Sequence, residues 1–118
     1  IYNVSEFYEN IDIYVCTSDK EGFCLPIYEA LLYGCIIVST YQPAIYDYLP
    51  KGTENNGIFM LKNVIRDNDS LLQKELTKLI AQSQEFKRNQ NKYMRYLNKL
   101  KKWNKDEKHY FKLPYIIN

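Results

Sequence analysis

Two glutamates, Glu21 and Glu29, are the residues whose types and spacing most directly suggest chemistry. They stand eight positions apart. Glu21 falls in a glycine-containing loop after an apolar segment, and Glu29 falls inside a short apolar segment that predicts a helix. This arrangement predicts two carboxylates around one small cleft. Such groups can bind sugar hydroxyls, or can stabilise the positive charge that develops at an anomeric carbon.

Glu29 has two explanations that its position alone does not separate. The predicted helix around it, residues 25–33, is apolar on nearly every side, and such helices are usually buried. A carboxylate inside an apolar layer needs partners. A vicinal diol, such as the 2′ and 3′ hydroxyls of a ribose, would satisfy both oxygens. The other explanation is a structural pairing with a lysine or a backbone amide.

Glu21 stands beside a potential anion site. The segment Gly22, Phe23, Cys24 and Leu25 runs into the start of the predicted helix, where backbone amides lack partners within the helix. These amides and the helix dipole favour a diphosphate or an electron-rich sugar. The alternative is a solvated loop glutamate next to Lys20.

The order of predicted elements is strand, helix, strand, turn, strand, long helix. Strands are expected at residues 11–16, 36–39 and 58–61, the second with apolar residues in succession, as in a parallel sheet. Helical segments are expected at residues 4–10, from Pro26 to before Gly34, for one turn within 41–50, and over 69–102 with a break at 83–91. The fold class is therefore α/β, half of a doubly wound parallel sheet.

Charge is divided unevenly along the 118 residues. Residues 1–86 carry a net charge of −6, and residues 87–112 carry +8. The basic segment also holds aromatic residues, including Tyr93, Tyr96 and Trp103. Such interleaving is found in proteins that bind nucleic acid or an anionic membrane surface. We favour the alternative of a solvated helix face whose aromatic residues pack on the domain, and we expect no nucleic-acid partner, while a peripheral membrane contact stays open.

The remaining composition argues against metal and disulfide chemistry. Cys16, Cys24 and Cys35 lie in or beside apolar segments without metal-ligand spacing, and His109 is the single histidine. Buried reduced thiols suit a cytoplasmic protein. No run of about 18 apolar residues predicts a membrane-spanning helix.

The sequence around the two glutamates resembles that of retaining glycosyltransferases with the two-domain GT-B fold, in the glycogen-synthase-like and sucrose-synthase-like group (family 4 type, group 1). The group's pattern is Ser-x-x-Glu-Gly-Phe-Gly-Leu-Pro-x-x-Glu-Ala-x-x-x-Gly. The matching residues are Ser18, Glu21, Gly22, Phe23, Leu25, Pro26, Glu29, Ala30 and Gly34.

The resemblance implies a role for each candidate residue. Glu29 would hold the donor ribose, and Glu21, as the catalytic residue, would contact the transferred sugar. The amides of Gly22, Phe23, Cys24 and Leu25 would contact sugar and diphosphate. It implies a nucleotide-sugar donor, a sugar, lipid or protein acceptor, and no metal or other cofactor.

The resemblance also implies a domain organisation. Residues 1–86 would be a donor-binding Rossmann-like subdomain, incomplete at its N-terminal side, and residues 87–118 a basic, aromatic helical tail of the same domain. The N-terminal domain with the acceptor site would belong to a longer chain. Two other functions stay open: a non-catalytic remnant or binding module with this fold, and an α/β interaction protein that uses its basic tail.

Three departures from the pattern affect the expected site. Cys24 stands where glycine is usual, so the backbone there is less free to approach a ligand. Ile36 replaces a common proline. A usual Gly-Gly-x-x-Glu stretch is replaced by residues 43–47, in which Asp47 is the candidate substitute for the glutamate.

We predict that the 118-residue chain alone has no hexosyltransferase activity, because catalysis in a two-domain cleft requires both reactants to be held in register. The measurement is sugar transfer or donor hydrolysis by the purified chain. Robust transfer by this chain would refute the prediction.

Overall fold

The computed structural model describes residues 12–17, 25–47, 49 and 51–106. Its centre is a three-stranded parallel sheet of strand order β1-β2-β3. The strands are β1 (Ile13–Cys16), β2 (Ile36–Ser39) and β3 (Ile58–Met60). The sequence predicted β2 with these bounds, and it placed the other two within a residue or two of those observed. This confirms the predicted α/β class with a partial doubly wound sheet.

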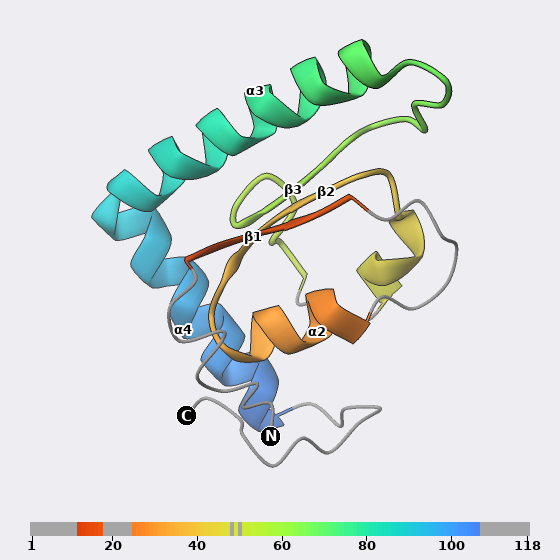
Figure 1. Cartoon of the computed structure of the whole chain (residues 1–118). Helices are drawn as coiled ribbons and strands as arrows, with labels where there is room; N and C mark the ends of the chain where they lie inside the picture. The colour runs from red at the N-terminus through yellow and green to blue at the C-terminus, as the bar shows by residue number, and fades with distance from the viewer. Residues whose placement is uncertain (1–11, 18–24, 48, 50, 107–118) are drawn as a thin grey trace, which may run out of the picture.

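The sheet is covered by helices on both faces (Figure 1). Helix α3 lies along one face, α2 lies against the other, and α4 runs from the end of α3 down to the side of α2. The helical elements are α2 (Leu25–Leu32), the 3-10 turn η1 (Pro43–Asp47), α3 (Asp69–Arg88) and α4 (Gln90–Asp106). The helix expected at residues 4–10 lies outside the described residues.

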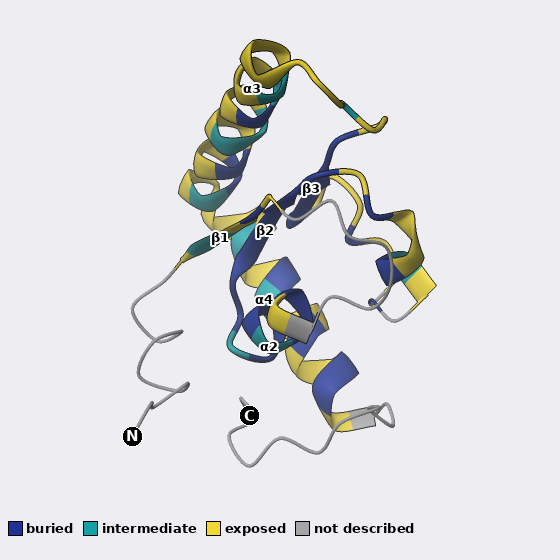
Figure 2. Cartoon of the chain, turned by 45° about the vertical axis from the view of Figure 1, so that its right-hand side comes forward, coloured by how far each residue is buried: buried dark blue, intermediate teal, exposed yellow. Residues whose placement is uncertain are grey.

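The core is centred on β2, whose four residues are all buried. Its three apolar side chains, Ile36, Ile37 and Val38, have 0% exposure. Full burial of such side chains contributes about 1.5–3 kcal/mol each. Figure 2 shows that α2 consists largely of buried residues, whereas α3 and α4 alternate between buried or intermediate residues and exposed ones. The fold is therefore stabilised mainly by covering the central strand.

Aromatic side chains join α4 to the rest of the core. The Phe86 ring meets the rings of Phe59 and Tyr96 edge-on, at centroid distances of 5.7 and 5.8 Å. The Tyr96 hydroxyl donates a hydrogen bond to the backbone oxygen of Cys35, at 2.5 Å. Gly57 makes room for this contact, because a Cβ at that position would lie 2.2 Å from the Tyr96 ring. Helix α4 thus crosses the amino-terminal ends of β2 and β3.

Asn89 explains the break between the two long helices, which falls within the range that the sequence predicted. Its backbone N–H donates to the carbonyls of Glu85 and Phe86 and so closes α3. Its side-chain oxygen accepts from the N–H of Lys92, at 3.2 Å, and caps α4. One residue therefore ends one helix and begins the next.

We expect Asn89→Ala to lower the free energy of unfolding by about 1 kcal/mol, the usual cost of losing an N-terminal cap. Urea denaturation followed by circular dichroism measures the change. The control is Asn98→Ala, an exposed site within α4 where alanine is the better helix former. Equal destabilisation by both substitutions would contradict the capping role of Asn89.

Candidate functional site

Helix α2 carries Glu29, which is the member of the glutamate pair that lies within the described residues. Pro26 occupies its first turn, where a missing N–H costs nothing. The helix ends in a Schellman motif, in which the N–H of Gly34 donates to Leu31 and that of Cys35 donates to Ala30. Gly34 has a φ of 78°, which this motif requires. Both sequence-predicted helix signals are confirmed, and they place Glu29 one turn from the helix start.

Glu29 is half-buried rather than enclosed as the apolar sequence predicted. The buried side of α2 consists of Ile27, Tyr28, Ala30, Leu31 and Leu32. Positions 26, 29 and 33 form a stripe on the opposite side, where they are exposed or half-buried. A helix with mostly apolar residues therefore still presents this carboxylate at its outer boundary.

The carboxylate of Glu29 makes no hydrogen bond or ion pair with any other residue that the structure describes. The structural explanation, in which a lysine neutralises Glu29, consequently finds no support among these residues. Because it has no partner among the described residues, this half-buried carboxylate is available to bind hydroxyl donors.

The four sequence-predicted residues Glu21, Gly22, Phe23 and Cys24 lie outside the described residues. Leu25 is described at its backbone, where it begins α2. The predicted closeness of the two glutamates therefore stays a prediction. The structure does establish that residue 17 follows the end of β1 and residue 25 begins α2, so the segment between them connects the carboxyl end of a strand to a helix N-terminus.

The carboxyl ends of the strands converge on Gln42, a residue that sequence reasoning missed. Its side chain, 6% exposed, places Nε2 3.2 Å from the Ser39 hydroxyl, 3.3 Å from the Thr40 hydroxyl and 3.5 Å from the Cys16 sulfur. Its backbone N–H donates to the sulfur of Met60, at 3.4 Å. Gln42 thus links the ends of all three strands, at the sheet edge where ligands bind in open α/β folds.

No sequence signal distinguished Gln42, because an isolated glutamine between a strand and a turn is typical of a solvated loop.

Asp47, the candidate substitute for the usual glutamate, lies at the end of η1 and is exposed. Beside it, burial and the nearby charge of Glu54 raise the pKa of Tyr46 above its ordinary value. The phenol is therefore neutral at physiological pH.

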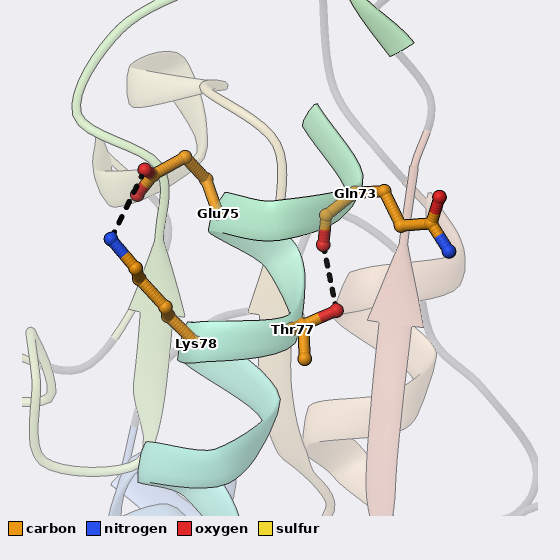
Figure 3. A network of polar contacts seen from close by, with 4 residues as sticks. All are labelled: Gln73, Glu75, Thr77 and Lys78. Atoms are coloured by element: carbon orange, nitrogen blue, oxygen red, sulfur yellow. Dashed lines mark hydrogen bonds and ion pairs between the residues drawn. The ribbon is translucent and has the colours of Figure 1, made fainter. Parts of the chain in front are cut away.

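A cavity of about 630 Å³ lies between the chain that leaves β3 and helix α3. Its walls include apolar side chains such as Leu61, Val64 and Leu71. Glu75 and Lys78 also line it, and they pair with each other at 3.4 Å, as Figure 3 shows beside the Thr77–Gln73 hydrogen bond. An exposed pair of this kind contributes little to stability. None of the sequence-predicted site residues lines this cavity.

The thiols of Cys16 and Cys35 are buried and free of disulfides, as the sequence predicted. Burial, with a smaller effect of Asp12, raises the pKa of Cys35 to about 12, so this thiol stays protonated and is a poor nucleophile. Among the described residues, no group of His, Cys, Asp and Glu could hold a metal ion. No described helix is long and apolar enough to span a membrane.

Helix α2 is held in place by the far end of α4. The Trp103 ring, 8% exposed, packs edge-on against Tyr28 at a centroid distance of 5.6 Å. Burial raises the pKa of the Tyr28 hydroxyl to about 12. Because Tyr28 immediately precedes Glu29, the far end of α4 helps to position the candidate ligand-binding carboxylate. The sequence predicted that the aromatic residues of this segment pack on the domain, but it did not identify α2 as the contact of Trp103.

We expect Gln42→Met, which keeps the side-chain length but removes the amide, to lower the free energy of unfolding by about 1–3 kcal/mol, the cost of leaving buried polar groups unpaired. Urea denaturation measures the change. The control is Gln73→Met on the exposed face of α3, where a change within about 0.5 kcal/mol is expected. Equal values for the two variants would show that the Gln42 network does not connect the strand ends energetically.

Comparison with known proteins supplies the family. A family model described as "Glycosyl transferases group 1" matches residues 2–108, a span that includes every described element of the fold. Comparisons with curated proteins and with solved structures gave no match. The parallel sheet with helices on both faces agrees with the resemblance noted in the residues around Glu29. The chain therefore belongs to the group 1 glycosyl transferases.

Proposed function

We propose that this chain is the donor-binding part of a retaining GT-B glycosyltransferase that moves a hexosyl group from a nucleotide sugar to an acceptor. Membership of the group 1 family supports glycosyl transfer in general. The observation that carries the finer proposal is Glu29, a half-buried carboxylate one turn into α2 without a partner among the described residues.

Glu29 is suited to the ribose of the donor. Its two oxygens accept hydrogen bonds and offer no donor, which matches the two adjacent hydroxyls of a ribose. Its neighbours on α2 are packed into the core, so the carboxylate is held by a rigid element. Little ordering is required on binding, and this favours affinity.

The segment before α2 is suited to the reacting end of the donor. In our proposal the backbone amides of Gly22, Phe23, Cys24 and Leu25 receive the diphosphate at the start of the helix. The bond between the anomeric carbon and the diphosphate oxygen breaks, and its electron pair leaves with the diphosphate. An acceptor oxygen forms the new bond on the same face, and its proton passes to the departing diphosphate oxygen.

Glu21 acts on the sugar in this proposal. Positive charge develops at the anomeric carbon as the leaving group departs, and a nearby carboxylate stabilises that charge in the transition state. Asp47 takes the position of the usual glutamate after β2. The side chains of this chain supply no metal site among the described residues, and the proposal uses none.

Donor binding tests this function directly. Calorimetric titration of the chain with nucleoside diphosphates and their sugar conjugates should show saturation for at least one of them. We expect Glu29→Ala to weaken that binding about ten- to a hundredfold, the loss of hydrogen bonds to a charged group. The matched control is Glu85→Ala on the exposed surface of α3, which should leave the affinity unchanged. Equal affinity of the two variants for the same nucleotide would contradict the assignment of Glu29.

Kinetics of the complete two-domain enzyme separate the two glutamates. Glu29→Ala should raise the donor KM more than it changes kcat, because the ribose is held alike in the ground and transition states. Glu21→Gln keeps the size and removes the charge, so it should lower kcat more than it changes donor binding. The reverse pattern would exchange the two roles. Loss of folding in Glu29→Ala would instead support a structural role.

A further inference from the structure

A second hollow, of about 240 Å³, lies at the amino-terminal edge of the sheet, opposite the edge where Gln42 joins the strand ends. Its cationic wall consists of Lys92, Arg95 and Lys99 on α4. Gly52 and Asn56, from the loop before β3, line the other side. We call these five residues the basic pocket.

The three cations of the basic pocket have no ion-pair partner among the residues that the structure describes. Their spacing of three and four residues places them on one face of α4. No carboxylate lines the hollow within the part of the chain that the structure describes. Like charges at this spacing repel one another, so a bound anion would relieve an unfavourable interaction.

The bottom of the basic pocket is formed by core residues, and one of its cations lies close to the loop before β3. Phe86 and Tyr96 form the floor, and both are buried in the core. Across the hollow, a Cβ added to Gly52 would lie 2.7 Å from the Lys99 ammonium nitrogen. The Lys99 ammonium therefore lies close to the loop backbone, while the side chain as a whole is exposed.

The size and the charge together select the ligand. Pockets for cofactors and drug-sized molecules occupy about 300–1,000 Å³, so this hollow suits one small group rather than a whole nucleotide. Lysine and arginine donors at short range bind phosphate oxygens through charge-assisted hydrogen bonds. We propose that the basic pocket binds a phosphate group, carried by a small phosphate compound or by a phospholipid headgroup.

Two charge-matched variants of the full chain test the proposal. The triple variant K92Q/R95Q/K99Q removes three cations from the pocket. The triple variant K101Q/K102Q/K105Q removes three exposed cations from the same helix outside the pocket. Both variants lower the net charge by the same amount. If anions were attracted only by the overall charge of α4, both variants would lose the same amount of binding. The conservative variant K92R/K99R keeps the charge and should keep binding.

The two sources of phosphate are tested in separate arms at about 0.15 M ionic strength, where long-range attraction is screened. In one arm, inorganic phosphate is titrated while amide chemical shifts are followed. In the other, the chain is sedimented with phosphatidylglycerol vesicles and with phosphatidylcholine vesicles. We expect saturable binding in at least one arm, centred on residues 52–56 and 92–99, and weakened about tenfold or more by the pocket variant alone.

The outcomes divide clearly. Saturation by inorganic phosphate identifies a small phosphate compound as the source, and binding confined to phosphatidylglycerol vesicles identifies the headgroup. Absence of saturable binding in both arms, or an equal loss in the two triple variants, would overturn the proposal. Neither arm contains a nucleotide, so failure here would leave the donor-binding proposal for Glu29 untouched.

Discussion

The burial of strand β2 is the constraint on which the rest of the structure depends. Its residues from Ile36 to Ser39 are fully buried between two neighbouring strands. A parallel strand of this kind is stable only when helices cover both faces of its sheet. Helices α2 and α3 provide that cover. Because the strands have only three or four residues, each buried side chain contributes a large share of the core. The position of Glu29 follows, since it lies on the outward side of a helix whose inner side must pack on β2.

Helix α4 makes this small sheet into one connected core. Its Tyr96 donates a hydrogen bond to the backbone just before β2 and meets the ring of Phe86 on α3. Nearer its other end, Trp103 packs against Tyr28 of α2. The most basic part of the chain is thus also a structural element: its aromatic residues face the core and its exposed lysines face solvent. The burial of Tyr96 and Trp103 confirms the packing predicted for these two residues. The cationic side of the helix stays available for the phosphate group that we propose.

The two edges of the sheet have different chemical character. At the carboxyl edge, Gln42 holds the strand ends together through neutral hydrogen bonds, and the segments that leave this edge carry the candidate donor-binding groups. At the amino edge, three cations of α4 form one wall of a small hollow. A ribose or sugar is recognised by directional hydrogen bonds, whereas a phosphate is recognised by concentrated positive charge.

The sequence by itself determined the fold class, the bounds of β2, the helix signals at Pro26 and Gly34, and the break near Asn89. Each depends on local chemistry: continuous apolar residues, a fixed φ, a left-handed glycine or a capping side chain. Only the tertiary structure showed that Glu29 is half-buried, that Gln42 joins three strand ends, and that Lys99 lies close to Gly52. The physical reason is that burial and charge proximity depend on which segments meet in space, and the periodicity of a single segment does not specify its partners.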